Sequence, residues 1–276
     1  SRLAQAVQGA MNRFDIAVIG AGSGGLSVAA AAAQFGQRVV LFEKSAMGGD
    51  CLNTGCVPSK ALLAAAKQAQ AFRDAAKYGI AASEPQVDFA KVMDHVHKVI
   101  ATIAPLDSQE RFEKLGVTVV RAEARFTGAA TLEADGQAFT ARRIVIATGS
   151  RAAVPPIPGL NDVPYFTNET IFENRTLPQH LIIIGGGPIG IEMAQGHRRL
   201  GSEVTVLEAF DPLAKDDPEL TAIVLDGLKA EGIRILARNA ISAVRTGGTG
   251  IVADTAAGTI EGTHLLVAAG RNPNIE

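Results

Sequence analysis

The feature that most constrains the fold is a glycine-rich turn that occurs twice at a constant spacing. The pattern G-x-G-x-x-G occupies residues 20–25 and returns at residues 185–190, an offset of 165 residues. Each turn follows a short apolar run and precedes a helical pattern. The next apolar run then ends in an acid, Glu43 or Glu208, again 165 residues apart. One such turn is a weak signal, but two complete βαβ units in register predict two dinucleotide-binding domains.

The first βαβ unit is expected to open an α/β domain that reaches the middle of the chain. Its expected parallel strands are apolar and rich in β-branched residues, and they span residues 14–19, 38–42 and 143–149. Its expected helices span residues 26–35, 60–78 and 87–115. Short antiparallel strands are expected before the closing strand, at residues 117–121, 124–127 and 131–134.

The second unit is expected to repeat this plan. Its expected strands span residues 181–184, 203–207, 234–236, 240–245, 251–254 and 264–270, and its helices span residues 191–200 and 217–232. The apolar runs 143–149 and 264–270 both end in small residues, so each is expected to close a domain. The predicted fold class is α/β, with two Rossmann-like dinucleotide-binding domains of the three-layer type, each with inserted antiparallel strands.

A proline-rich stretch at residues 155–159 predicts a rigid crossing between the two domains. The boundary is therefore placed there, with one domain at residues 11–155 and the other at residues 156–276. Residues 1–10 fit no later pattern, and we expect them to be a tag or lead segment ahead of a natural start at Met11.

The overall charge narrows the class of partner. The net charge of −2 argues against nucleic acid or a membrane surface as the partner. No apolar run reaches the ~18 residues needed to span a bilayer, and no basic segment followed by an apolar run marks a secretory signal. We therefore expect a cytoplasmic protein that acts on a small molecule.

Cys51 and Cys56 are the only 2 cysteines of the chain, and they lie in a glycine-rich stretch. A close pair in a chain of this length is more often redox-active or metal-binding than structural. Cys56 precedes the helical run 57–67, whose N-terminal dipole stabilises a thiolate. Cys51 is expected in the loop ahead, more accessible, as an exchange thiol must be. A kink at residues 53–55 would fold Cys51 back onto Cys56.

Two other interpretations of the cysteines stay open at this point. They could be two unpaired thiols of the core, because free cysteine is often buried, although a glycine-rich loop makes a poor core. They could bind zinc, which needs four ligands. No histidine or second cysteine pair lies near them, so no metal site is expected.

The glycine turns and the two acids fit nucleotide chemistry. The glycines allow backbone to approach a pyrophosphate, and the free N–H groups at the helix start bind its phosphates. Glu43 and Glu208 can each accept from a ribose diol. Glu208, Gly190 and the lack of a cation at Ala209 and Phe210 favour NAD(H) over NADP(H). Two nucleotide sites and one dithiol suggest an electron relay from a nicotinamide through a flavin to the cysteines.

Residues 48–60, Gly-Gly-Asp-Cys-Leu-Asn-Thr-Gly-Cys-Val-Pro-Ser-Lys, resemble the redox motif of the class I pyridine nucleotide-disulfide oxidoreductases. This family includes dihydrolipoamide dehydrogenase, glutathione reductase and mercuric reductase. The order of motifs matches over residues 14–276, and residues 103–112 are similar to a segment of the mercuric-reductase-like branch. The resemblance implies an FAD-dependent flavoprotein that passes electrons between NAD(P)H, flavin and a redox-active disulfide. Its substrate would be a disulfide, a dithiol or Hg(II).

The resemblance also implies individual roles. Cys56 would be the charge-transfer thiol nearest the flavin, and Cys51 would be the interchange thiol. Lys60 would lie near the flavin ring and pair with Glu192. Pro188 stands where glutathione reductases carry an aromatic gate, so no swinging gate is expected.

The residues expected at the nucleotides combine the turn glycines and the two acids with positions that the resemblance implies. Those expected at FAD are Gly20, Gly22, Ser23, Gly24, Gly25, Glu43, Lys44, Gly49, Asp50, Cys51, Lys60, Ala124, Thr148, Gly149 and Ser150. Those expected at NAD(H) are Gly185, Gly187, Pro188, Ile189, Gly190, Glu208, Ile241 and Gly270.

In the family, the point where this sequence stops is followed by a segment that completes the FAD site and by an interface domain with a catalytic His-Glu pair. The histidines match no such pair: His95, His97, His180, His197 and His264. We therefore expect a truncated chain, inactive alone, that lacks the central and dimer-interface domains of a homodimer. The competing hypothesis is a non-catalytic fragment that binds NAD(H) through residues 180–270 and FAD weakly or not at all.

Overall fold

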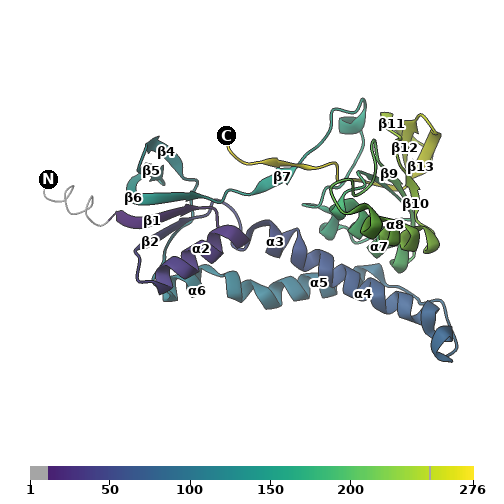
Figure 1. Cartoon of the computed structure of the whole chain (residues 1–276), viewed down its shortest axis with the longest axis horizontal. Coiled ribbons are helices and arrows are strands. Elements are labelled where there is room, and N and C mark those ends of the chain that lie inside the picture. Colours follow the sequence, from purple (N-terminus) through teal and green to yellow (C-terminus); the bar gives the residue numbers. More distant parts are fainter. Residues whose placement is uncertain (1–11, 249) are drawn as a thin grey trace, which may run out of the picture. The chain divides into compact units, whose positions relative to one another are not determined.

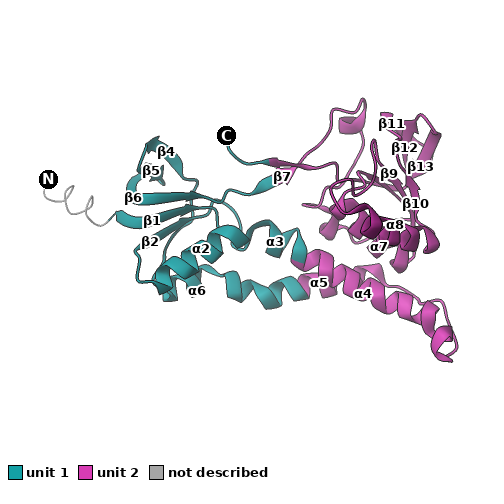
Figure 2. Ribbon diagram, viewed as in Figure 1, with its two compact units in different colours: residues 1–56, 99–150, 273–276 teal, residues 57–98, 151–272 magenta. Residues whose placement is uncertain are grey.

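The structure, a computed structural model, describes residues 12–248 and 250–276. The predicted lead segment at residues 1–10 and the start at Met11 lie outside the described residues. The chain divides into two compact units. Unit 1 comprises residues 1–56, 99–150 and 273–276, and unit 2 comprises residues 57–98 and 151–272 (Figure 2).

Unit 1 is built on a six-stranded sheet in the order β3-β2-β1-β6-β5-β4 (Figure 1). Its strands are β1 (Arg13–Ile19), β2 (Val39–Phe42), β3 (Thr118–Val120), β4 (Arg125–Gly128), β5 (Thr131–Ala134) and β6 (Gln137–Ile146). The strands β3, β2, β1 and β6 are parallel, whereas β5 and β4 are antiparallel to their neighbours. Its helices are α2 (Ser23–Gln34), α3 (Gly49–Asn53) and α6 (Gln109–Lys114), with a 3-10 turn at Ala104–Asp107.

Both faces of the central strands of unit 1 are buried. On one face, Val18 and Leu41 pack with Leu26 of α2. On the other face, Val40 packs with Phe139 of β6. A parallel strand that is buried on both faces has a continuous apolar sequence, which explains why β1 and β2 could be located within one residue at either end.

The predicted helix over residues 87–115 is wrong as a single element. The structure has α5 (Phe89–Ile103), the 3-10 turn at Ala104–Asp107 and then α6. Pro105 lacks the N–H that a continuing helix needs, so the helix ends before it. Ser108 is extended and restarts the helix, because its Oγ accepts the Arg111 N–H at 3.3 Å as an N-cap.

The strand predicted at residues 117–121 exists, but its predicted antiparallel pairing is wrong. Val119 of β3 lies opposite Leu41 of β2 in a parallel pair. The chain between these two strands is helical, and such a crossover returns the second strand in the same direction.

Unit 2 contains a parallel sheet in the order β10-β9-β8-β14 and an antiparallel sheet in the order β11-β12-β13. The parallel strands are β8 (His180–Ile184), β9 (Glu203–Leu207), β10 (Arg234–Leu236) and β14 (His264–Val267). The antiparallel strands are β11 (Ile241–Gly247), β12 (Gly250–Thr255) and β13 (Gly258–Gly262), of which β13 was not predicted. The helices that follow β8 and β9 are α7 (Pro188–Leu200) and α8 (Pro218–Ala230), and short 3-10 turns lie at Leu160–Asp162 and Ile171–Glu173.

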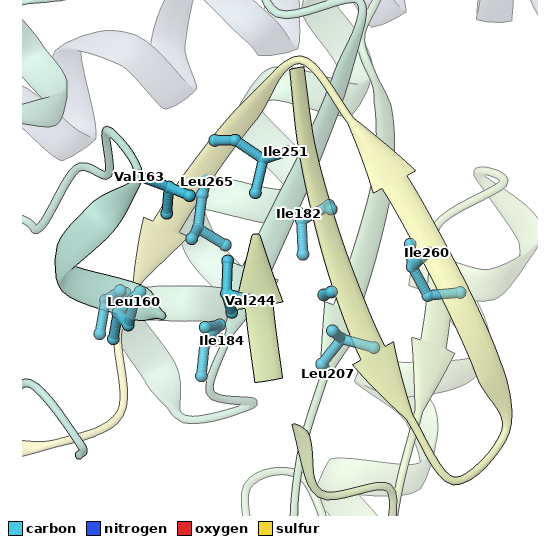
Figure 3. Packing of buried hydrophobic residues seen from close by; sticks show 11 residues of the cluster. Leu160, Val163, Ile182, Ile184, Leu207, Val244, Ile251, Ile260 and Leu265 are labelled. Carbon is cyan, nitrogen blue, oxygen red and sulfur yellow. The ribbon is translucent and has the colours of Figure 1, made fainter. Parts of the chain in front are cut away.

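The core of unit 2 lies between its two sheets (Figure 3). Ile182 and Leu265 of the parallel sheet pack with Val244 and Ile260 of the antiparallel sheet. Helix α7 packs on β8 and β9, and a Cβ built at Gly190 would lie 3.3 Å from Ile183. Antiparallel sheet, parallel sheet and helix therefore form the three layers that the sequence predicts.

Residues 57–98 belong to unit 2, which differs from the predicted division at residues 155–159. They carry most of α4 (Cys56–Asp74), a 3-10 turn at Ala75–Tyr78 and the first part of α5. The missing side chain of Gly196 on α7 leaves room for Leu62, and Arg73 Nη1 donates to the Arg199 carbonyl oxygen at 2.7 Å. These tertiary contacts with α7 have no signal in the local sequence.

Two short strands, β7 (Ser150–Ala152) and β15 (Arg271–Pro273), pair with each other where the chain passes between the units. Among the helices of the described residues, none combines the length and the apolar character that a membrane span requires.

Candidate redox and nucleotide-binding sites

The cysteine pair lies at a break between two helices. Gly48 has a φ of 86° and begins the five-residue helix α3, which carries Cys51. The helix ends at Thr54, whose φ of −139° is not helical. Asn53 stabilises this arrangement, because its Nδ2 donates to the carbonyl oxygens of Met47 at 3.1 Å and of Gly49 at 2.8 Å. Helix α4 then begins at Cys56, so the predicted kink at residues 53–55 is confirmed.

The break folds Cys51 back onto Cys56. The Cys51 thiol donates a hydrogen bond to the Cys56 sulfur, the Cys56 N–H donates to the Cys51 sulfur, and the structure holds the pair as free thiols. Burial, followed by the neighbouring Cys56 sulfur, raises the pKa of Cys51 to about 11. The Cys51 sulfur therefore keeps its proton at neutral pH and sits within reach of its partner.

The predicted order of exposure of the two thiols is wrong. Cys51 is partly buried and lies within a helix, whereas Cys56 is exposed. The reason is the position of α3, whose first residues pack against the glycine turn. A Cβ built at Gly49 would lie 2.6 Å from the Gly22 Cα, and Gly48 N–H donates to the Ala21 carbonyl oxygen at 2.9 Å.

The first glycine turn has no room for a side chain at its first and last glycines. Gly20 has a φ of 102°, and a Cβ there would lie 2.3 Å from the Ala147 carbonyl oxygen. A Cβ at Gly25 would lie 1.8 Å from the Gly20 carbonyl oxygen. Gly22 is the N-cap of α2, and Ser23 and Gly24 begin the helix. The first N–H groups of a helix lack partners inside it and are suited to bind phosphate.

Glu43 holds this turn in shape. Its carboxylate lies at the end of β2 and is only 8% exposed. Oε2 accepts the Ala21 N–H at 2.7 Å, and Oε1 accepts the Ser45 N–H at 2.7 Å. The predicted ribose acceptor therefore also connects the glycine turn to the loop that follows β2.

A pocket of about 150 Å³ opens at the carboxyl ends of β1 and β2. Its lining includes five of the residues predicted at FAD: Gly20, Glu43, Lys44, Ala124 and Thr148. Segments far apart in the sequence thus converge as the prediction requires. Lys44 forms an ion pair with Glu123 at 3.1 Å beside this pocket.

The sequence prediction missed Asn274, which also lines this pocket. Its Nδ2 donates to the Thr148 carbonyl oxygen at 3.0 Å, its N–H donates to the Gly149 carbonyl oxygen at 3.0 Å, and Thr148 Oγ1 donates to its carbonyl oxygen. The available signal was the polar run at residues 271–274, directly after the second small-residue strand end. Ser150, also predicted at FAD, begins β7, and Asp50 Oδ1 accepts the Thr54 hydroxyl at 2.7 Å.

The second glycine turn reproduces the first with the same atoms. Gly185 has a φ of 111°, and a Cβ at Gly190 would lie 2.0 Å from its carbonyl oxygen. Glu208 accepts the Gly186 N–H at 2.6 Å and the Phe210 N–H at 2.9 Å. All three partners stand 165 residues after Ala21, Glu43 and Ser45. The repeat seen in the sequence is therefore a repeat of hydrogen bonds.

The remaining residues predicted at NAD(H) surround this turn from several segments. Gly187 is the N-cap of α7, and Pro188 and Ile189 are its first residues. Ile241 begins β11, and the segment before it reaches the site because the Asn239 N–H donates to the Glu208 carbonyl oxygen at 2.9 Å. Gly270 follows β14 and accepts the Ala153 N–H at 2.9 Å.

Lys60 and Glu192 meet as the resemblance implies. Lys60 Nζ lies 2.6 Å from Glu192 Oε1. Lys60 is on α4, one helical turn after Cys56, and Glu192 is on the first turns of α7. The Lys60 side chain is largely exposed, so the ion pair orients it more than it stabilises the fold.

His180 and His197 lie apart from the cysteines in sequence and have local partners. Burial lowers the pKa of His197 to about 4, although its Nδ1 lies 2.9 Å from the Met193 carbonyl oxygen. His180 Nε2 lies 2.9 Å from Thr205 Oγ1, and burial lowers the pKa of His180. Among residues 12–248 and 250–276, no group of three or more His, Cys, Asp or Glu side chains could hold a metal ion.

Comparison with known proteins agrees with this geometry. The family model described as pyridine nucleotide-disulphide oxidoreductase matches residues 14–276. The chain is 38% identical over 269 residues to mercuric reductase of Streptomyces lividans, covering 94% of this chain and 56% of that protein. It is 33% identical over 267 residues to glutathione reductase of Nostoc sp., covering 95% of this chain and 58% of that protein.

A solved structure shows the same fold. The HOCl-induced flavoprotein disulfide reductase RclA from Escherichia coli matches with a TM-score of 0.81 and 27% sequence identity, covering 94% of this chain and 57% of that one. The chain thus spans a little over half the length of these relatives. With a family model that covers nearly all of its residues, the chain belongs to the pyridine nucleotide-disulphide oxidoreductase family.

Proposed function

We propose that this chain is the nucleotide-binding part of an FAD-dependent enzyme that passes electrons between NAD(P)H, flavin and the Cys51–Cys56 pair. The substrate would be a disulfide, a dithiol or Hg(II). The observation that carries the proposal is the placement of the cysteine helix α3, whose first residues pack on the first glycine turn. Mercuric reductase and glutathione reductase among the relatives support it.

The residues of unit 1 fit a dinucleotide. Gly20 and Gly25 allow no side chain, the amides at the start of α2 suit phosphate, and the pocket beside Glu43 suits a ribose. FAD would be held by these groups together with Lys44, Ala124 and the residues that follow β6. Bound there, it would supply two-electron exchange with a nicotinamide on one side and a dithiol on the other.

We propose that unit 2 binds NAD(H) in preference to NADP(H). Glu208 lies at the end of β9, where it can accept from a ribose diol and would repel a 2′-phosphate. Ala209 and Phe210 provide no cation to offset that repulsion. Fluorescence titration with NADH and NADPH tests this preference, and equal affinity for the two would refute it.

The two thiols are assigned different roles. Cys51 keeps its proton and lies against the Cys56 sulfur. Cys56 is exposed and begins the 19-residue helix α4. Following the family resemblance, we propose Cys56 as the charge-transfer thiol and Cys51 as the interchange thiol, with Lys60 oriented by Glu192.

Counting thiols tests this function directly. The oxidised chain, with its Cys51–Cys56 disulfide formed, is incubated with FAD and NADH without oxygen, then alkylated and weighed by mass spectrometry. Reduction consumes one NADH and one proton and yields NAD⁺ and two thiols, so two alkyl groups are expected. Omission of FAD is the control, and an unchanged disulfide in the complete mixture would contradict the proposal.

A second candidate function is favoured by the part of its relatives' length that this chain spans. Because it spans 56% of the Streptomyces lividans protein, it could be a nucleotide-binding fragment without turnover. That reading predicts binding of NADH with no new thiols in the same assay. For the whole protein we propose a cytoplasmic homodimer, as the family resemblance implies, to be tested by light scattering on the longer chain.

A further inference from the structure

A second hollow of unit 1 lies beside the cysteine helix. It is a groove of about 810 Å³, well within the range of small-molecule sites. Leu52 and Asn53 of α3 form part of its lining, and these residues directly follow Cys51. The opposite part of the lining comes from the 3-10 turn at Ala104–Asp107 and from α6. The groove is distinct from the pocket at the ends of β1 and β2, with which it shares no residue.

Cys51 directly precedes Leu52 and Asn53, the two residues of α3 that line the groove. Burial and the neighbouring Cys56 are the main causes that raise the pKa of the Cys51 thiol, and the charge of Asp107 adds to them. Asp107 is the last residue of the 3-10 turn whose Ala104 and Pro105 line the groove. A molecule in the groove is therefore adjacent to the helix that carries the interchange thiol.

The charged lining of the groove is mainly acidic. Glu110 and Glu113 line it from α6, and Asp107 ends the 3-10 turn that precedes this helix. The lining cation is Arg121, whose Nη2 donates to the Ser45 carbonyl oxygen. The Glu113 carboxylate accepts a hydrogen bond from the uncharged Gln109 Nε2 at 2.8 Å. The field at this end of the groove favours positive over negative ligands.

We propose that this groove receives the disulfide substrate of Cys51 and that Glu110 and Glu113 select cationic or uncharged disulfides over anionic ones such as glutathione disulfide. The inference rests on the proposed function, because it takes Cys51 as the interchange thiol. Glu110 and Glu113 are specificity-determining residues in this assignment and take no part in bond exchange.

The exchange step balances without any other reactant. The Cys51 thiol gives up its proton, and its sulfur attacks one sulfur of the substrate R–S–S–R, which forms a mixed disulfide and releases R–S⁻. The Cys56 sulfur then attacks the Cys51 sulfur, which closes the Cys51–Cys56 disulfide and releases the second R–S⁻. The two protons of the dithiol pass to the two released thiolates, so the protein is oxidised by two electrons and the substrate is reduced to two thiols.

The test compares disulfides of different charge. The chain is reduced with dithiothreitol, desalted, and mixed with cystamine (two ammonium groups), hydroxyethyl disulfide (uncharged) or glutathione disulfide (anionic). Closure of the Cys51–Cys56 disulfide is followed by acid quench, alkylation and mass spectrometry. Each rate is divided by the rate at which a small free thiol reacts with the same disulfide, which removes differences in the intrinsic reactivity of the three disulfides. We expect cystamine to react fastest and glutathione disulfide slowest.

Variants locate the source of this preference. The double variant Glu110→Gln with Glu113→Gln removes both charges and is expected to lower the ratio of the cystamine rate to the glutathione disulfide rate by about fivefold. The reason is that one pair of charges ~10 Å apart in water changes a rate by roughly a factor of two. Glu133→Gln with Glu203→Gln changes the net charge equally at exposed sites and is expected to leave the ratio unchanged. On the unmodified chain, added salt should slow cystamine and speed glutathione disulfide.

The outcomes separate this inference from the proposed function. Exchange with no charge preference, or a ratio that falls equally in both double variants, overturns the inference and leaves Cys51 as an exchange thiol. If Cys51 reacts with none of the three disulfides, both the inference and the proposed thiol role are overturned. Because reduction is by dithiothreitol, the result does not depend on delivery of electrons by FAD and NADH. The salt effect on the unmodified chain decides the question even where a variant fails to fold.

Discussion

Glu43 offers the sharpest test of how the first nucleotide turn is held together. Its two carboxylate oxygens accept the N–H groups of Ala21 and Ser45, each at 2.7 Å, and the side chain is 8% exposed. In Glu43→Gln, one oxygen can still accept one N–H, but the amide NH₂ then faces the other N–H. One of the two charge-assisted hydrogen bonds is therefore lost, and its backbone N–H donor stays buried without an acceptor. The other hydrogen bond remains, but its acceptor is no longer charged. The expected loss of unfolding free energy is about 2–4 kcal/mol.

The chain has no Trp, so urea unfolding is followed by far-ultraviolet circular dichroism. Hydrogen exchange of the Ala21 amide gives a local readout, which matters because the two compact units need not unfold together. A loss of about 3 kcal/mol corresponds to roughly 100-fold faster exchange.

Two variants serve as controls. Glu133→Gln, at an exposed site in the same unit, should stay within about 0.5 kcal/mol of the parent chain. Glu208→Gln removes the same pair of bonds at a more exposed position and should cost less than Glu43→Gln. If Glu43→Gln unfolds like Glu133→Gln and the Ala21 amide exchanges at the parent rate, the carboxylate does not hold the turn.

Three further predictions follow from the sites. Gly190→Ala should destabilise unit 2 by about 1–3 kcal/mol and weaken NADH binding in a fluorescence titration, because its Cβ would lie 2.0 Å from a carbonyl oxygen. Gly227→Ala, in α8 away from the turn and with open space at its Cβ, should bind normally. In the reduced chain at pH 8, iodoacetamide should label exposed Cys56 before Cys51, whose pKa is about 11, and peptide masses that show the reverse order would contradict this. The pKa of His197 is lower in the folded chain than in the unfolded chain, so only the unfolded chain gains this proton as the pH falls from about 6.5 to about 4. Up to about 3 kcal/mol of stability should be lost across that window, and His197→Gln should remove this part of the pH dependence in urea titrations.

Local patterns were enough to predict the two βαβ units. The strand at residues 203–207 was located without error, because a buried parallel strand is a continuous apolar run between a glycine and an acid. The turn glycines were predictable because the G-x-G-x-x-G pattern marks positions where the backbone conformation or a close contact excludes a side chain. The convergence of Lys44, Ala124 and Thr148 on one pocket followed from the family resemblance and not from any local pattern.

The errors arose where distant contacts decide the structure. The parallel pairing of β3 depends on the crossover that precedes it, and residues 57–98 join unit 2 through contacts with α7. The strand β13 pairs with β12 after a short turn of small residues that carries little hydrophobic signal. The exposure of the cysteines depends on how α3 packs against the glycine turn. The spacing of Cys51 and Cys56 in the sequence carries no information about this packing.

The close approach of Gly49 to Gly22 has a consequence for any attempt to move this dithiol to another protein. A Cβ at Gly49 would lie 2.6 Å from the Gly22 Cα, so no spacer separates the phosphate-binding turn from the helix that carries Cys51. A Rossmann domain that receives only residues 48–60 would keep its own turn, which need not meet the helix at this distance or angle. The transplantable module is therefore the turn and the cysteine helix together, and a graft of the motif alone should give two ordinary thiols.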